Sequence, residues 1–268
     1  MHELSKYADF DKLLKDNNYA NEKFLKVRKI DNLYLIKYDK KHLHYDNIDT
    51  LGLFRSIICD EKKIVSFSPP KSRNLLDIQN IADYNKDDYI FEEFVEGTMI
   101  NVFWNENKND WDLATRSNIG GKCCFNINNK PTATFRYMFL DAMNSTKLNF
   151  SDLNKKYSYS FVLQHPENQI VVPFNMKTIT LVSVFSFDNF TVKIELNEFD
   201  RIITQLDKFG VFCPRHFNLF FPEVNTFNEL IDLFNESNNI DYKILGCVLL
   251  HKHNGTRIKI RNKTYCDP

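Results

Sequence analysis

The chain of 268 residues is long enough for one large domain or two small ones, and at 43% hydrophobic it can bury a substantial core. Lys and Arg number 35, and Asp and Glu number 35, so the net charge exerts no long-range attraction on nucleic acid. Any binding of RNA therefore requires a local basic surface.

The first half of the chain predicts one helix followed by strands. Apolar residues at helical spacing predict an amphipathic helix over 8–28. We expect residues 1–50 to form an extension of helix and strand that packs on a core made of residues 51–268. Apolar runs predict strands at 33–38, 53–59, 63–68, 89–104 and 111–116.

The second half of the chain mixes helical and strand patterns, which predicts an α+β fold. Thr226 and Glu229 have the spacing of a capping box, and Asn254-Gly255 is a strong signal for a hairpin turn. Helical patterns cover 132–143, 197–209 and 226–235, and strand patterns cover 158–164, 179–187, 190–194, 244–251 and 256–261.

Short polar segments recur among these strands. An Arg interrupts the apolar strand at 53–59, and a Pro-Pro-Lys-Ser-Arg-Asn segment follows at 69–74. Glu-Gly stands at 96–97, Thr-Arg-Ser at 115–117, Leu-Gly at 245–246 and Arg-Ile-Lys-Ile-Arg at 257–261.

Taken in order, these segments resemble the motifs of RNA ligases of the phage RNA ligase 1 type, over roughly residues 53–265. Pro166 and Asn168 match a further block of that family, where Gln169 replaces an arginine. The candidate binding residues for a nucleotide or phosphate that the resemblance implies are Arg55, Lys71, Glu96, Gly97, Arg116, Gly246, Lys259 and Arg261. The resemblance implies an ATP-grasp-like nucleotidyltransferase domain of the DNA/RNA ligase and capping-enzyme type, with antiparallel sheets flanked by helices. It also implies an RNA ligase-like protein of large DNA viruses that lacks the C-terminal RNA-specificity domain.

Three positions depart from that family pattern. Phe94 stands at the position of the nucleophilic lysine, and Val162 and Leu245 replace two carboxylates. A phenyl ring has no lone pair with which to attack the α-phosphate of ATP, and Mg²⁺ requires oxygen ligands. We therefore expect a catalytically inactive protein that has no metal site and requires no cofactor. Apolar replacements also indicate a repacked interior, because an unpaired buried charge would be costly.

Three functions remain open. The first is a non-catalytic protein that binds a nucleotide, with ATP as a candidate ligand, or an RNA 5′-phosphate through the retained cations. The second is a scaffold with a filled pocket that binds a protein partner. The third is an active ATP-dependent RNA ligase with a displaced nucleophile, for which Lys37 in Lys-Tyr-Asp is the nearest match. In the simplest alternative, each cation pairs with a nearby acid such as Glu96, Asp112 or Glu167.

The remaining expectations concern location. The chain has no apolar run of membrane length and no signal-peptide pattern at its charged N-terminus, so we expect no membrane association. Its six cysteines lack zinc-site spacing, and buried reduced thiols are typical of the cytoplasm, which for a viral protein is that of the host.

Overall fold

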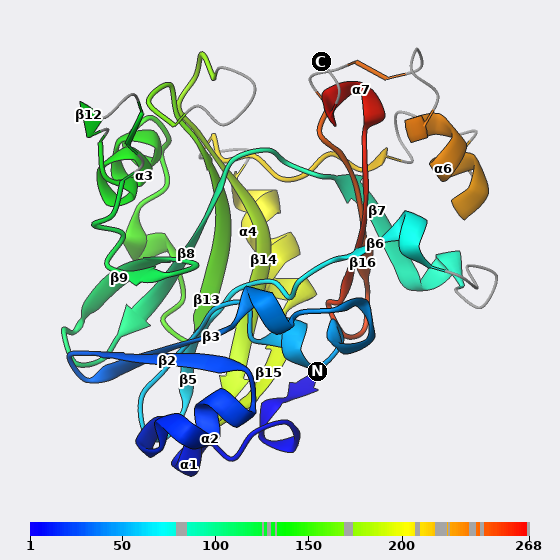
Figure 1. The fold of residues 1–268 in the computed structure, drawn as a ribbon. Coiled ribbons are helices and arrows are strands. Elements are labelled where there is room, and N and C mark those ends of the chain that lie inside the picture. Colours follow the sequence, from blue (N-terminus) through cyan, green and yellow to red (C-terminus); the bar gives the residue numbers. More distant parts are fainter. Residues whose placement is uncertain are drawn as a thin grey trace.

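The centre of the protein is a seven-stranded antiparallel sheet in the order β1-β15-β14-β13-β8-β9-β10 (Figure 1). The computed structural model describes residues 1–78, 85–124, 126–127, 130–131, 133–168, 174–206, 210–217, 224, 226–235, 240–241 and 244–266. The strands of the central sheet are β1 (His2–Glu3), β8 (Thr98–Asn105), β9 (Asp110–Thr115), β10 (Asn118–Ile119), β13 (Tyr157–Gln164), β14 (Thr178–Asp188) and β15 (Thr191–Ile194).

Two helices cover this sheet. Helix α3 (Phe135–Asn144) buries Phe135, Met138, Phe139 and Ala142 in one core with residues of β8, β9, β13 and β14. Their helical spacing places these apolar residues on one face, which the sequence pattern predicted. Helix α4 (Leu196–Leu206) lies against β14. The helices predicted at 132–143 and 197–209 are thus confirmed, although residues 132 and 207–209 lie outside the described part.

A second, four-stranded sheet lies beside the first, in the order β6-β17-β16-β7 (Figure 1). All its pairs are antiparallel except β6 with β17, which run parallel. Helix α6 (Phe227–Asn235), which confirms the prediction at 226–235, packs on one of its faces. The other elements here are β6 (Arg73–Asn74), β7 (Tyr89–Glu93), β16 (Gly246–His251), β17 (Arg257–Arg261) and α7 (Lys263–Cys266).

The third sheet has the order β2-β3-β4-β5 and joins residues on both sides of position 50. Strand β3 pairs antiparallel with β4 through Tyr34 and Cys59, so no break in the sheet falls at that position. The elements of this region are α1 (Phe10–Lys15), α2 (Asn17–Glu22), β2 (Leu25–Ile30), β3 (Leu33–Tyr38), β4 (Ile57–Cys59) and β5 (Ile64–Phe67).

The single helix predicted over 8–28 is wrong. Asp16 ends α1 and caps α2, because its carboxylate accepts a hydrogen bond of 2.8 Å from the backbone N–H of Asn18. Phe24 then has a φ of 57°, which ends the helical segment and starts strand β2 at Leu25. A strand therefore occupies the last part of the predicted helix.

The strand predicted over 89–104 is two strands in two different sheets. Strand β7 ends at Glu93 in the four-stranded sheet, and β8 begins at Thr98 in the seven-stranded sheet. The link between them has Gly97 at a φ of 141°, a backbone conformation that side-chain-bearing residues rarely adopt. The apolar pattern continues through this link, so periodicity alone did not reveal the break.

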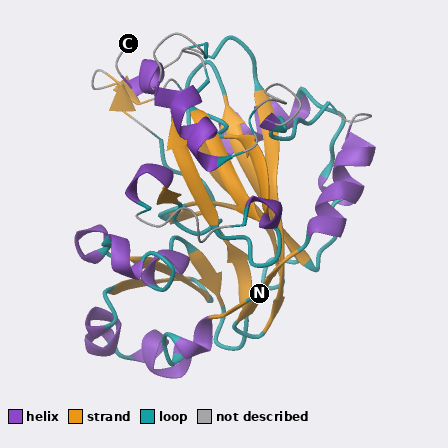
Figure 2. Cartoon of the chain, turned by 90° about the vertical axis from the view of Figure 1, so that its right-hand side faces the viewer, coloured by secondary structure: helices purple, strands orange, loops and turns teal. Residues whose placement is uncertain are grey.

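Helices lie at the periphery of the strands, as Figure 2 shows. No helix in the described part of the chain is long and apolar enough to span a membrane. The remaining elements are the small strands β11 (Asn126–Ile127) and β12 (Lys130–Pro131) and 3₁₀ turns at Leu4–Lys6, Lys40–His42, Tyr45–Asn47, Leu51–Leu53, Leu75–Asp77, Lys86–Asp88 and Phe150–Asp152.

Candidate functional site

The candidate site lies where the chain passes from the four-stranded to the seven-stranded sheet. The backbone N–H of Phe94 donates to the carbonyl of Gly246 over 2.9 Å, which holds the link against β16. A Cβ at Gly97 would lie 2.4 Å from the carbonyl oxygen of Leu163 and 2.7 Å from Cγ1 of Val162. The glycine therefore permits the close approach of the link to β13.

A cavity of about 210 Å³ opens beside this link. Five cationic side chains of the described residues line it, and we call it the cation pocket. Lys71 packs against Gly52, where a Cβ would come within 3.2 Å of the lysine Cβ. Three of the cations alternate along β17 and therefore share one face of that strand. The five cations are Arg55, Lys71, Arg257, Lys259 and Arg261.

No acidic side chain lines the cation pocket among the residues that the structure describes. In the same described part, Arg55, Lys71, Lys259 and Arg261 form no ion pair with a carboxylate. Burial, together with Lys71, Arg261 and Arg55, lowers the pKa of Lys259 to about 8. Burial and the charge of Arg55 also lower the pKa of Lys71. The pocket thus holds positive charges that repel one another.

Among the described residues, Arg257 is the pocket cation that pairs with a carboxylate, and it was not among the predicted site residues. Its Nη2 lies 3.5 Å from Oε1 of Glu92, and both side chains are buried. Burial raises the pKa of Glu92 to about 7, against the opposing effect of Arg257. Glu92 lines a separate, more apolar cavity of about 260 Å³, which shares Val182 with the cation pocket. The alternation of 257, 259 and 261 was the signal that could have identified Arg257.

Arg116 and Lys37 lie outside the lining of the cation pocket. The guanidinium of Arg116 lies 4.7 Å from the ring centroid of Tyr38, and its charge contributes to the lowered pKa of Lys71. Lys37 donates a hydrogen bond of 2.7 Å to Oγ of Ser117. Arg116 therefore adds to the positive field of the pocket from a neighbouring position.

The three positions that depart from the ligase pattern have different surroundings. Phe94 and Val162 line the cation pocket, and the Lys259 ammonium lies 5.8 Å from the Phe94 ring centroid. Leu245 does not line it, and its carbonyl accepts a hydrogen bond of 3.0 Å from the backbone N–H of Asn262. Glu96 is buried outside the pocket, and its backbone carbonyl accepts a hydrogen bond from the side-chain amide of Gln164.

Gly246 does not line the pocket and lies close to the backbone of β17. Its φ is 153°, and a Cβ there would lie 2.1 Å from the carbonyl oxygen of Ile260. This glycine therefore lets β16 start close against the strand that carries Lys259 and Arg261. Among the described residues, no group of three His, Cys, Asp or Glu side chains is placed to hold a metal ion.

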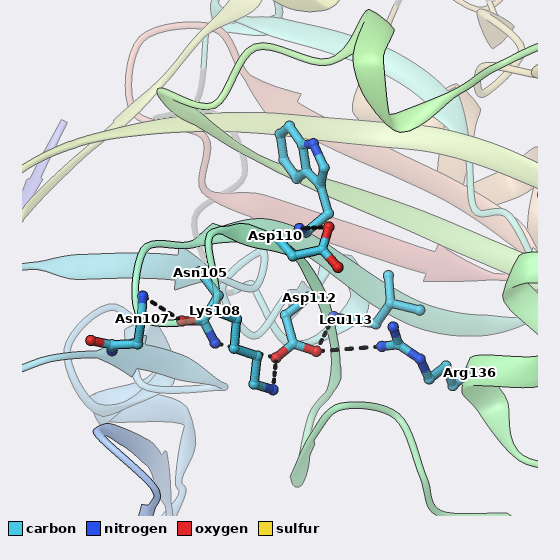
Figure 3. Close-up of polar contacts among 8 residues, drawn as sticks. Asn105, Asn107, Lys108, Asp110, Asp112, Leu113 and Arg136 are labelled. Atoms are coloured by element: carbon cyan, nitrogen blue, oxygen red, sulfur yellow. Dashed lines mark hydrogen bonds and ion pairs between the residues drawn. The ribbon is translucent and has the colours of Figure 1, made fainter.

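Asp112 is paired elsewhere, with cations that are not part of the pocket. Its carboxylate accepts hydrogen bonds of 2.6 Å from Lys108 and 3.4 Å from Arg136, which point at it from two sides (Figure 3). Asn105 and the backbone N–H of Leu113 complete its partners at 3.3 and 2.9 Å. Asp112 therefore does not neutralise the cation pocket.

The fold is similar to that of solved DNA and RNA ligases. A putative ATP-dependent DNA ligase from Aquifex aeolicus matches with a TM-score of 0.57 at 13% identity, over 92% of this chain and 61% of that one. An archaeal ATP-dependent RNA ligase matches with a TM-score of 0.56 at 13% identity, over 92% and 60%. A mutant Naegleria gruberi RNA ligase with ATP and Mn matches with a TM-score of 0.50 at 12% identity, over 90% and 75%.

These likenesses show the fold: antiparallel sheets and helices arranged as in the nucleotidyltransferase domain of DNA and RNA ligases, which confirms the predicted fold class. The chain spans about 60% of the length of the Aquifex and archaeal proteins. No protein-family model matches the chain. No curated protein matches it either.

Proposed function

We propose that this chain is a catalytically inactive, RNA ligase-like protein that binds a nucleotide or an RNA 5′-phosphate in the cation pocket. The observation that carries the proposal is the gathering of Arg55, Lys71, Lys259 and Arg261 around one cavity that no described carboxylate lines. Close like charges repel, and the repulsion grows as water is excluded. An anionic ligand relieves that repulsion, and phosphate oxygens suit both guanidinium and ammonium groups.

The proposal of inactivity rests on Phe94. It lies on the link between the sheets and faces the same cavity as the cations, where its ring supplies no nucleophile. Val162, the second replaced position, also lines the cavity and supplies no oxygen to a metal ion. Lys37, the displaced-nucleophile candidate, lies outside the lining.

Intact-mass measurement tests the inactivity. Wild-type protein is incubated with ATP and Mg²⁺, and in parallel with GTP and Mg²⁺, and its mass is then recorded. We expect no gain of a nucleoside monophosphate. An adduct on any lysine, Lys259 included, would overturn this part of the proposal.

Binding of 5′-phosphorylated single-stranded RNA tests the anion site. We expect affinity at low salt that weakens as salt rises, because bound phosphates release counterions from the nucleic acid. Lys259→Ala with Arg261→Ala should reduce it at least tenfold. Lys62→Ala with Lys156→Ala removes the same charge from two exposed positions outside the pocket and is the matched control, expected to bind as wild type.

A second candidate function is that of a scaffold for a protein partner. The Phe94 ring beside Lys259 and the buried Val162 favour it, because apolar side chains occupy part of the cavity wall. No binding of RNA or nucleotide at low salt, or equal loss in the pocket variant and its control, would favour this second function.

A further inference from the structure

A second hollow adjoins the cation pocket. This hollow, of about 650 Å³, shares Lys71, Ser72, Lys259 and Arg261 with the pocket. We call it the outer groove; Tyr45, Leu76 and Lys263 line it and do not line the pocket. Because four described side chains border both spaces, the groove adjoins the pocket directly.

The cation pocket is too small to enclose an oligonucleotide. Its volume of about 210 Å³ is below the roughly 300–1,000 Å³ of sites that enclose a whole small molecule. Among the described residues, the apolar cavity beside Glu92 shares one lining residue with the pocket, whereas the outer groove shares four. The groove therefore has the wider border with the pocket.

The wall of the outer groove combines exposed apolar surface with positive charge. Tyr45 is 37% exposed and Leu76 is 52% exposed. Lys263 adds a cation beyond those that the two spaces share, and Asp77 is the one acid among the described lining residues. Proteins bind single-stranded nucleic acids with this combination, because cationic side chains bind the phosphates and aromatic rings stack on the bases.

The ring of Tyr45 is held in place before any ligand binds. The guanidinium of Arg73 lies 4.6 Å from its centroid. Arg73 in turn pairs with Asp49 through Nε and Nη2, at 3.0 and 2.5 Å. A ring that is already ordered costs less conformational entropy when a base stacks on it.

We propose that the outer groove binds the second nucleotide of a single-stranded RNA whose 5′-terminal phosphate lies in the cation pocket, with the base of that nucleotide against Tyr45. The inference rests on the proposed function of the pocket. It makes the ligand an oligonucleotide in preference to a free mononucleotide.

Isothermal titration of the full chain at low salt with two probes tests the groove. AMP supplies the 5′-terminal nucleotide with its phosphate, and the 5′-phosphorylated dinucleotide pApA adds the second nucleotide. We expect wild type to bind pApA about tenfold more tightly than AMP, the gain typical of one stacked base. Tyr45→Ala should abolish that preference and leave AMP affinity unchanged, whereas Tyr45→Phe, which keeps the ring over Arg73, should retain it.

The outcomes separate the groove from the pocket. Equal affinity for AMP and pApA in wild type, or a preference that survives Tyr45→Ala, overturns the groove assignment and leaves the pocket standing. Failure of both probes to bind wild type overturns the proposed function, and the groove assignment with it. Unchanged melting temperatures of the exposed Tyr45 variants exclude misfolding as the cause of a lost preference.

Discussion

Two charged regions of this protein are built in opposite ways. Around Asp112, which is 2% exposed, Lys108 and Arg136 face one buried carboxylate, and hydrogen bonds fill its remaining positions. In the cation pocket, Lys259 and its neighbours face one another without a carboxylate among the described lining residues. The carboxylate of the first region has cationic partners within the chain, whereas no described carboxylate lines the second region.

The difference separates charge that serves the fold from charge that serves a ligand. In a matched cluster each charge has an opposite charge as its partner within the chain. Its removal therefore lowers the stability of the fold and leaves ligand binding unchanged. An unmatched cluster is a cost to the folded state, which an anion removes when it binds. The same reasoning predicts opposite stability changes when the two regions are mutated.

The largest expected effect is at the matched cluster. Asp112→Ala should lower the free energy of unfolding by about 2 kcal/mol, because it deletes a buried acceptor and leaves Lys108 and Arg136 unpaired. Urea denaturation followed by circular dichroism measures the change. Lys108→Ala is the control, because Lys108 is the more exposed of the two cationic partners. It should lower the free energy of unfolding by less than about 1 kcal/mol. Stability retained in Asp112→Ala would show that the cluster is not structural.

The next effect is the pH dependence of RNA binding. The folded pKa of Lys259 is about 8, so its ammonium is lost as pH rises through that value and the pocket loses attraction for phosphate. We expect affinity for 5′-phosphorylated RNA to fall about tenfold between pH 7 and pH 9.5. Lys259→Arg keeps its charge over this range and should flatten the profile. An unchanged slope in that variant would remove Lys259 from the site.

The unmatched cluster should gain stability when it loses a charge. Lys259→Met keeps much of the side-chain volume and should raise the free energy of unfolding by about 1 kcal/mol after allowance for solvent screening. Since the folded pKa lies below that of the unfolded chain, the unfolded state binds the extra proton between about pH 8 and pH 10.5. Wild-type stability should therefore rise with pH through that window, and the variant should lack this rise. A loss of stability in Lys259→Met would mean that the charge is compensated.

The smallest expected effect is at the link between the sheets. Phe94→Lys alone should give no nucleotide adduct with ATP and Mg²⁺, because Val162 and Leu245 still supply no metal ligand. Intact-mass measurement checks this at the same protein concentration as wild type. Strand joining or an adduct in this variant would show that the metal is held by residues other than these positions.

The sequence predicted most helices and strands, and it placed the cations of the site in ordered segments. The strand predicted over 256–261 contains Lys259 and Arg261, and the hairpin signal at Asn254-Gly255 located the end of β16 correctly to within three residues. It missed the crossing between sheets at 94–97, because strand periodicity does not report which partner a strand has. The partner of each strand is decided by the packing of the folded chain.

The sequence also could not predict which charged residues of the site pair with each other. Asp112 follows Trp111 in the predicted strand and was a candidate partner for the cations, yet it pairs with Lys108 four residues earlier and with Arg136 on α3. Arg257 on β17 and Glu92 on β7 are far apart in the chain. They meet across β16, which pairs with both of these strands. Such pairings depend on strand order, which residue types alone do not specify.

The most direct test of the account is the melting temperature of two proteins with and without tripolyphosphate at low salt. Wild type should melt at a higher temperature with tripolyphosphate, because a ligand that binds the folded state stabilises it. The variant with Lys259→Met and Arg261→Met should melt higher than wild type without the anion and show no further rise with it. A wild-type melting temperature that tripolyphosphate leaves unchanged, with a variant that melts lower, would contradict the claim that the cation pocket is built for an anion.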